Sequence, residues 1–165
     1  MKKIAFALLV ITVLAFAQNI YAQASNLQNA PSPKKFAQNA KFALVIGNSN
    51  YTGLSPLANP ANDAADIAAA LEYLGFTVDK VINGNQEQIE NAVSRLSERL
   101  SADRNSYGFF FYAGHGVQFN GENFLIPVNA NILNENHLRN RAVSVQTLLD
   151  DLNDAGNSLN VVVLD

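Results

Sequence analysis

His115 and the two glycines beside it are the residues of this chain best suited to chemistry. His115 stands between Gly114 and Gly116, directly after the aromatic run Tyr107–Ala113. Such a run is typical of a strand buried on both faces of a parallel sheet, and ligands of open α/β sheets gather at the carboxyl ends of such strands. Because glycine lacks side-chain bulk, we expect a substrate backbone to approach the imidazole closely. The alternative is a histidine that ends a strand and bonds a nearby carbonyl group, but the flanking glycines favour a site residue.

Asp165 could share a crevice with this histidine, and Asp63 is a second acid of interest. Asp63 lies near the start of a predicted helix, where its alternative role is to stabilise the helix dipole by roughly 0.3–1 kcal/mol. Asp165 follows the apolar run Leu159–Leu164, which we predict to be a strand beside that of His115. The alternative for Asp165 is an ordinary solvated residue.

Composition excludes several classes of function. The 165 residues contain no cysteine and two histidines, so we expect no disulfide, no thiolate metal site and no metal cofactor. The segment after the first predicted strand lacks the glycine spacing of a dinucleotide loop and the lysine of a phosphate loop, which argues against a nucleotide cofactor. A net charge of −3 without a basic, aromatic patch argues against a nucleic-acid partner.

Strands and helices alternate along the predicted fold. Apolar runs predict strands over 42–47, 76–82, 107–113 and 159–164, and helices with one apolar face occupy three of the intervals between them. Asn85 (with Gln88) and Ser144 are expected N-caps, Gly75 and Gly156 are expected stops, and Asn120-Gly121 predicts a hairpin of 117–119 with 123–126. This order predicts an α/β fold with a parallel sheet and helices on both faces.

The amino-terminal segment has the features of an export signal. Residues 1–24 combine a basic start, an apolar stretch over Ile4–Ala17 and a small-x-small site at Ala22–Ala24, which predicts a signal peptide. The apolar stretch is short for a bilayer span, although an uncleaved anchor is the alternative. We expect a flexible leader over 25–41 and a folded domain over 42–165. The protein is then expected to be exported, periplasmic or extracellular, and without membrane contact after cleavage.

The sequence stops at the carboxyl end of a predicted sheet strand, which would leave an apolar edge unpaired. We therefore expect a fold truncated after its fourth main strand, which could pair with a missing C-terminal segment. An edge strand that is tolerated as it stands is the alternative.

Six motifs in order resemble those of the caspase-like cysteine peptidases, and most closely the bacterial metacaspase-like branch. The motifs are Ala43–Asn48, Leu57–Ala64, Leu74–Phe76, Phe111–Gly116, Asn123–Pro127 and Val163–Asp165. They span about Phe42 to Asp165, and the Tyr-Ala-Gly-His-Gly block is the most specific of them. The resemblance implies a partial p20-type domain with the three-layer caspase-like (caspase–hemoglobinase) fold and a central, mostly parallel sheet.

The same resemblance implies roles for individual residues. His115 matches the catalytic histidine that serves the nucleophilic cysteine, and the amide of Gly116 matches an oxyanion-hole donor. Asp63 and Asp165 match the acids that favour Arg or Lys before the cut in metacaspases. The family's cysteine stands two residues beyond the aspartate that Asp165 resembles, so this sequence stops short of it. Asn129 stands where the family often has aspartate, which weakens any expectation of calcium dependence.

Two functions from different classes remain open. The first is the histidine-bearing part of an exported caspase-like cysteine endopeptidase, inactive by itself for want of a nucleophile, with peptide or protein substrates. The second is a non-catalytic caspase-like module that binds peptides or partners. A serine hydrolase using Ser49 or Ser55 is disfavoured because no Gly-x-Ser-x-Gly turn is present.

Overall fold

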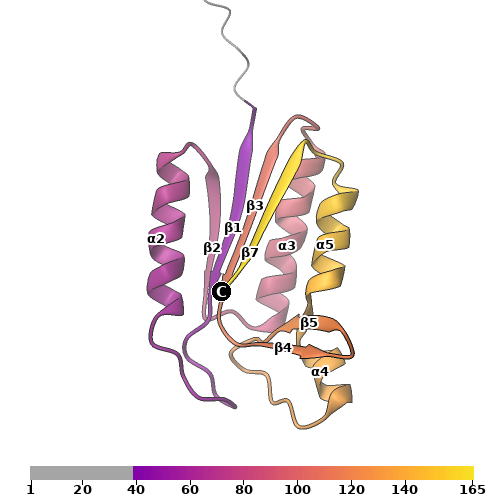
Figure 1. The fold of residues 1–165 in the computed structure, drawn as a ribbon. Coiled ribbons are helices and arrows are strands. Elements are labelled where there is room, and N and C mark those ends of the chain that lie inside the picture. Colours follow the sequence, from indigo (N-terminus) through magenta and orange to yellow (C-terminus); the bar gives the residue numbers. More distant parts are fainter. Residues whose placement is uncertain (1–38) are drawn as a thin grey trace, which may run out of the picture. The chain divides into compact units, whose positions relative to one another are not determined.

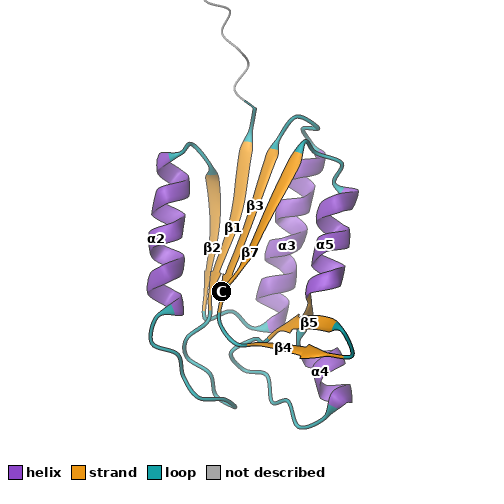
Figure 2. Cartoon of the chain, in the orientation of Figure 1, coloured by secondary structure: helices purple, strands orange, loops and turns teal. Residues whose placement is uncertain are grey.

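The computed structural model describes residues 39–165. The elements are β1 Lys41–Gly47, α2 Pro60–Tyr73, β2 Thr77–Ile82, α3 Gln86–Ser101, β3 Tyr107–Ala113, β4 Gly116–Phe119, β5 Glu122–Leu125, α4 Glu135–Arg141, β6 Val143–Ser144, α5 Val145–Asp154 and β7 Leu159–Leu164 (Figure 2). The expected signal peptide over 1–24 and the expected leader up to residue 38 lie outside the described residues. Within 39–165, no helix is both long enough and apolar enough to cross a bilayer.

Four parallel strands form the main sheet, in the order β2-β1-β3-β7. The aromatic strand β3 lies between β1 and β7, with Phe111 opposite Val45 on one side and Val163 on the other. Phe110 and Tyr112 face one side of the sheet and Phe109 and Phe111 the other, since side chains alternate along a strand. The expected α/β class with a parallel sheet is confirmed.

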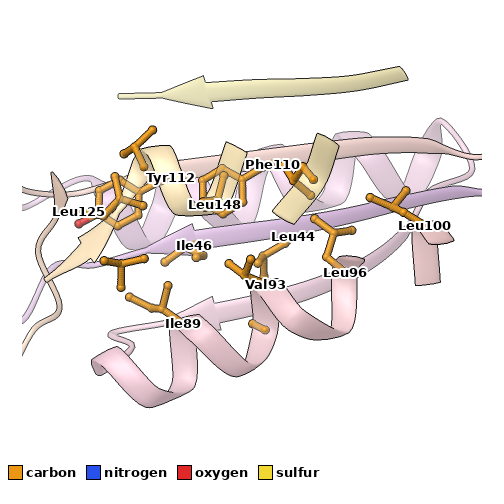
Figure 3. Close-up of a cluster of buried hydrophobic side chains, with 14 of the residues drawn as sticks. Leu44, Ile46, Ile89, Val93, Leu96, Leu100, Phe110, Tyr112, Leu125 and Leu148 are labelled. Carbon is orange, nitrogen blue, oxygen red and sulfur yellow. The ribbon is translucent and has the colours of Figure 1, made fainter. Parts of the chain in front are cut away.

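Helices cover both faces of this sheet, which gives three layers (Figure 1). Helices α3 and α5 pack on one face and α2 on the other. Figure 3 shows the larger core, where the apolar stripe of α3 packs against β1 and β3; its labelled residues are Leu44, Ile46, Ile89, Val93, Leu96, Leu100, Phe110, Tyr112, Leu125 and Leu148. Burying one such side chain stabilises the fold by roughly 1.5–3 kcal/mol.

The helix termini follow their sequence signals. Asn85 Oδ1 accepts the backbone N–H of Gln88 at 2.8 Å, and Gln88 Oε1 accepts that of Asn85 at 2.9 Å, which completes a capping box at the start of α3. Ser144 Oγ accepts the backbone N–H of Thr147 at 3.3 Å at the start of α5. Gly75 follows α2 with a φ of 84°, a conformation that side chains disfavour.

A second, antiparallel sheet of order β4-β5-β6 lies beside the carboxyl ends of the main strands (Figure 1). Its hairpin turns at Asn120 and Gly121, whose φ values of 50° and 84° suit a two-residue turn. Helix α4 and the two-residue strand β6 were not expected from the sequence. Helix α4 offers a single buried apolar residue, Leu138, which contacts the cluster of Tyr51, Phe124 and Ile126.

Candidate active site

His115, Asp63 and Asp165 line one open hollow at the carboxyl edge of the main sheet. The hollow has a volume of about 410 Å³ and is lined by residues 57–60, 63, 113–115 and 165. His115 and Asp63 are half-buried, and Asp165 is exposed. Three of the four site residues inferred from the sequence are therefore brought together in space, and Gly116 is the fourth.

The ladder between β3 and β7 places the histidine beside Asp165. The N–H of Asp165 donates to the carbonyl of Tyr112 at 2.9 Å, and the N–H of Gly114 donates to the carbonyl of Asp165 at 3.3 Å. Parallel pairing thus continues past the end of both strands. His115 and Asp165 leave the sheet from neighbouring strands, as the pattern of strands predicts.

A glycine at the end of β1 brings Asp63 to the same edge. A Cβ at Gly47 would overlap the carbonyl oxygen of Pro60 and would lie 2.7 Å from Cβ of Ala64. The first turn of α2 can pack against β1 only because this atom is absent. Ser49 Oγ accepts the N–H of Ala61 at 3.1 Å and ties the loop after β1 to the same turn.

The imidazole of His115 is bonded through one nitrogen. Nε2 lies 2.8 Å from the carbonyl oxygen of Ser55. A carbonyl oxygen can only accept, so Nε2 carries the proton and Nδ1 is the basic nitrogen of the neutral ring. Within residues 39–165, no hydrogen bond to Nδ1 occurs. The bond to a nearby carbonyl, expected for a purely structural histidine, is present, yet it leaves the ring able to act as a base.

Two tyrosines that were not predicted to be site residues contact this histidine. The rings of Tyr51 and His115 lie with their centroids 4.6 Å apart and their planes at 57°. Tyr51 Oη accepts the N–H of His115 at 2.8 Å, and Tyr112 Oη donates to the carbonyl of His115 at 2.8 Å. Burial raises the pKa of both phenols above the ordinary value of 10.0. The sequence offered one signal for this role: Tyr51 is an aromatic residue in the otherwise polar loop that follows β1.

The glycine before the histidine has a different use from the one expected. A Cβ at Gly114 would lie 2.6 Å from Oη of Tyr51 and 2.7 Å from Oη of Tyr112. The space that this glycine provides is therefore occupied by the two hydroxyl groups, which corrects the expectation that it serves the approach of a substrate backbone.

The glycine after the histidine presents its amide at the edge of the hairpin. Gly116 is opposite Leu125, and the neighbouring bond runs from the N–H of Ile126 to the carbonyl of His115 at 3.0 Å. Gly116 and Leu125 are thus a non-hydrogen-bonded pair, and the N–H of Gly116 points away from β5. Gly116 lines a second hollow of about 340 Å³, which also includes Asp165 but not His115 or Asp63.

Two asparagines brace the loops around the site and were also missed. The buried Asn48 accepts the N–H of Gly84 at 2.8 Å through Oδ1 and donates to the carbonyl of Ile126 at 3.3 Å through Nδ2. Asn83 Oδ1 accepts the N–H groups of Ser49 and Asn50, each at 2.9 Å. Within residues 39–165, no three His, Asp or Glu side chains converge to hold a metal ion.

Comparison with known proteins identifies the family. The family model described as Caspase domain matches residues 40–165. Mucosa-associated lymphoid tissue lymphoma translocation protein 1 of Homo sapiens is 33% identical over 126 residues, and its Mus musculus homolog is 32% identical over the same length. These alignments cover 76% of this chain but only 15% and 14% of the two relatives.

A solved structure shares the fold. A protein of Geobacter sulfurreducens superposes with a TM-score of 0.60 at 17% identity, covering 76% of this chain and 50% of that one. At this identity the likeness concerns the fold alone. The family model and the two curated relatives confirm the resemblance to caspase-like peptidases, and the chain belongs to the caspase domain family.

Proposed function

We propose that this chain is the histidine-bearing part of an exported caspase-like cysteine endopeptidase of the metacaspase-like branch. The observation that carries the proposal is the bond from Nε2 of His115 to the Ser55 carbonyl at 2.8 Å. It assigns the proton to Nε2 and leaves Nδ1 as a base at the rim of a hollow that holds two carboxylates. Export rests on the signal-like sequence of residues 1–24 and predicts a mature chain that starts at Ser25, which N-terminal sequencing of the secreted protein would test.

In this mechanism, Nδ1 of His115 accepts the proton of a cysteine thiol, and the thiolate attacks the carbonyl carbon of the scissile bond. The imidazolium then gives its proton to the leaving amine. Water, deprotonated by the same imidazole, hydrolyses the thioester and restores the thiol. The Ser55 carbonyl keeps the ring in one tautomer through these transfers, because it remains an acceptor for Nε2–H throughout.

The amide of Gly116 is the proposed donor to the oxyanion. Its N–H points away from the hairpin ladder, and a carbonyl oxygen that gains charge can accept it. Gly116 follows His115 directly, so base and donor come from adjacent residues. Truncating such a donor in other proteases typically costs about 10²–10³ in kcat, but a backbone amide has no side chain to remove.

The two acids would select a basic side chain before the cut. Asp63 and Asp165 line the same hollow as His115, and two carboxylates suit the forked donors of a guanidinium group. A lysine ammonium would fit the same charges with less directional bonding. We therefore propose Arg or Lys as the residue before the scissile bond.

The nucleophile is not among these residues. None of the 165 is a cysteine, so the thiol must come from outside this sequence, and the chain alone is proposed to be inactive. Strand β7 lies at the edge of the main sheet and exposes Leu159, Val161 and Val163. A further segment that carries the cysteine could pair with this edge.

The test compares the 165-residue chain with a longer product that includes whatever the gene encodes beyond the codon for Asp165. Peptides ending in Arg or Lys before a reporter group should be cleaved by the longer product only. In that product His115→Ala should lower kcat by about 10²–10⁴-fold, whereas the matched change His137→Ala should leave it within about twofold. Turnover by the 165-residue chain that survives thiol alkylation would refute the proposal.

A binding module is the second candidate. The exposed apolar edge of β7 and the absence of cysteine favour it, since strand addition binds a peptide without any chemistry. If no cysteine codon follows in any frame, and Arg-containing peptides bind the hollow without being cleaved, this function replaces the first. Loss of that binding in Asp63→Asn would locate the peptide.

A further inference from the structure

A closed ring of hydrogen bonds passes through the main chain of His115 and the hydroxyl groups of Tyr51 and Tyr112. The N–H of His115 donates to Tyr51 Oη at 2.8 Å. Tyr112 Oη lies 2.8 Å from the carbonyl oxygen of His115 and 3.0 Å from that of Ile126, both of which can only accept. The single hydroxyl proton of Tyr112 therefore points to these carbonyls.

The direction of the remaining bond follows by elimination. The two hydroxyl oxygens are 3.3 Å apart, and either could in principle donate. Since the proton of Tyr112 is already used, the proton of Tyr51 points to Tyr112. The ring then runs from the N–H of His115 through Tyr51 and Tyr112 to the carbonyl of His115, and every member both donates and accepts.

The two phenols are anchored in separate apolar clusters. Tyr51 is buried with Phe124, Ile126 and Leu138, whereas Tyr112 is buried in the core between the main sheet and helices α3 and α5. Burial raises the pKa of both, so both keep their protons at the pH values where an imidazole titrates. The hydrogen-bond ring therefore keeps its geometry when the His115 imidazole accepts and returns a proton in the proposed mechanism.

We infer that Tyr51 and Tyr112 are positioning residues for His115, fixing its main chain through the hydrogen-bond ring and its imidazole through the face of Tyr51. The inference deepens the proposed peptidase function and its catalytic meaning rests on that proposal. The fixed main chain and the aromatic contact keep Nε2 on the Ser55 carbonyl, so that Nδ1 is the base in every molecule rather than in a fraction of them.

The two hydroxyl groups have unequal parts in this arrangement. Tyr51→Phe removes the acceptor of the His115 N–H and keeps the aromatic ring, so it isolates the hydroxyl group from the packing. Tyr112→Phe leaves that acceptor in place, and the carbonyl of His115 still receives the N–H of Ile126 at 3.0 Å. The first change should therefore disturb His115 more than the second.

The test uses the full 165-residue chain with ¹⁵N-labelled histidine. It contains only two imidazoles, His115 and His137, so His137 is an internal reference for folding. In the neutral ring, protonated and unprotonated nitrogens give separate signals, which report the tautomer directly. The wild type should show one tautomer at His115, with the proton on Nε2.

In Tyr51→Phe the two ring signals of His115 should move toward each other, and deuterium exchange of its amide should rise about fivefold relative to that of His137. Tyr112→Phe should raise the exchange of the His115 amide less than twofold. It should also shift the tautomer of His115 less than Tyr51→Phe does. Tyr73→Phe is the matched control, because Tyr73 is 92% exposed, and it should change neither.

Unchanged tautomer and exchange at His115 in a folded Tyr51→Phe chain overturn the inference. If that variant does not fold, seen as denatured signals from His137, the wild-type chain decides: a His115 ring with its proton on Nδ1, or shared between both nitrogens, overturns the inference. In the longer product with a cysteine, Tyr51→Phe should lower kcat and leave KM unchanged. A longer product that cleaves nothing overturns the peptidase function but leaves the spectroscopic result standing.

Discussion

The two histidines of this chain lie in regions built in opposite ways. His115 stands at the edge of the main sheet with its N–H, its carbonyl and Nε2 all bonded, and with Nδ1 as the basic nitrogen. His137 lies in the first turn of α4, where its N–H donates to Asn134 Oδ1 at 3.0 Å. Its Nδ1 accepts the N–H of Leu133 at 3.4 Å, so the nitrogen that could act as a base already has a partner.

The difference shows what makes a histidine available for chemistry. Both rings carry their proton on Nε2 when neutral, but only one offers the other nitrogen. Around His115 the two supporting tyrosines are buried, and Tyr51 is 64 residues away in the sequence. Helix α4 instead has one buried leucine and a surface ion pair, Arg139 with Glu135 at 3.2 Å. Exposed pairs of this kind typically contribute about 0.2–1 kcal/mol.

The largest expected effect comes from breaking the support of the His115 region at Asn48. Its side chain is fully buried and bonds Gly84 and Ile126. Asn48→Ala leaves a buried N–H and buried carbonyl groups without this partner, so the free energy of unfolding should fall by about 2–4 kcal/mol. Urea denaturation followed by circular dichroism measures it.

The matched change in the His137 region is Asn134→Ala. Asn134 also accepts a backbone N–H, but at the exposed start of α4, so its loss should cost only about 1 kcal/mol. Equal losses for the two variants would show that the loops around His115 are no better braced than a surface helix.

The next prediction compares the stability effects of substituting the two glycines beside His115. A Cβ at Gly114 would press on two tyrosine hydroxyls, whereas a Cβ at Gly116 would meet only the Phe124 carbonyl oxygen at 3.5 Å, an ordinary contact. Gly114→Ala should therefore destabilise the fold by about 1–3 kcal/mol. Gly116→Ala, the control, should cost less than about 1 kcal/mol in the same denaturation assay.

If Gly116→Ala proves the more damaging of the two, the space beside the imidazole is not where the tyrosine hydroxyls lie. The two glycines flank the same histidine but also differ in backbone conformation, because Gly114 has a φ of 158°, which side chains rarely adopt, and Gly116 has no positive φ. Their ranking therefore tests the combined need for space and for this backbone conformation at Gly114.

How much could be predicted depended on whether the signal was local. Strand β3, the cap at Asn85 and the Asn120-Gly121 turn were predicted because continuous apolar runs, capping and turn chemistry act over a few residues. His115 and Asp165 could be brought together because parallel neighbouring strands end at one edge of a sheet. These inferences needed topology but no knowledge of side-chain contacts.

The missed features depend on contacts between distant residues. Tyr51 meets His115 across 64 positions and the Ser55 carbonyl meets it across 60, and no spacing rule encodes such pairs. Helix α4 was missed because its sequence has one apolar residue and hence no period. The role of Gly114 was misread because an empty side-chain position looks the same in sequence whether a substrate or a hydroxyl group fills it.

The smallest effect tests the buried phenols through their response to alkali. Burial raises the pKa of Tyr112 well above its ordinary value of 10.0. Below pH 10 both folded and unfolded chains keep the phenol proton, so its contribution to stability is intact. Above pH 10 the unfolded chain releases the proton while the folded chain retains it, so stability falls as the pH rises. Between pH 9 and 11 the loss from Tyr112 should be about 1.4 kcal/mol.

Comparing wild type with Tyr112→Phe isolates this contribution, because all other ionisable side chains are the same in both proteins. The free energy of unfolding, measured by urea at each pH, should fall less steeply in Tyr112→Phe, whereas Tyr73→Phe should keep the wild-type slope. The hydroxyl group of Tyr73 is in contact with water in the folded chain as in the unfolded one, which makes Tyr73→Phe the control. Identical slopes in all three proteins would mean that the phenol of Tyr112 meets solvent in the folded chain, and the hydrogen-bond ring around His115 could not then persist as described.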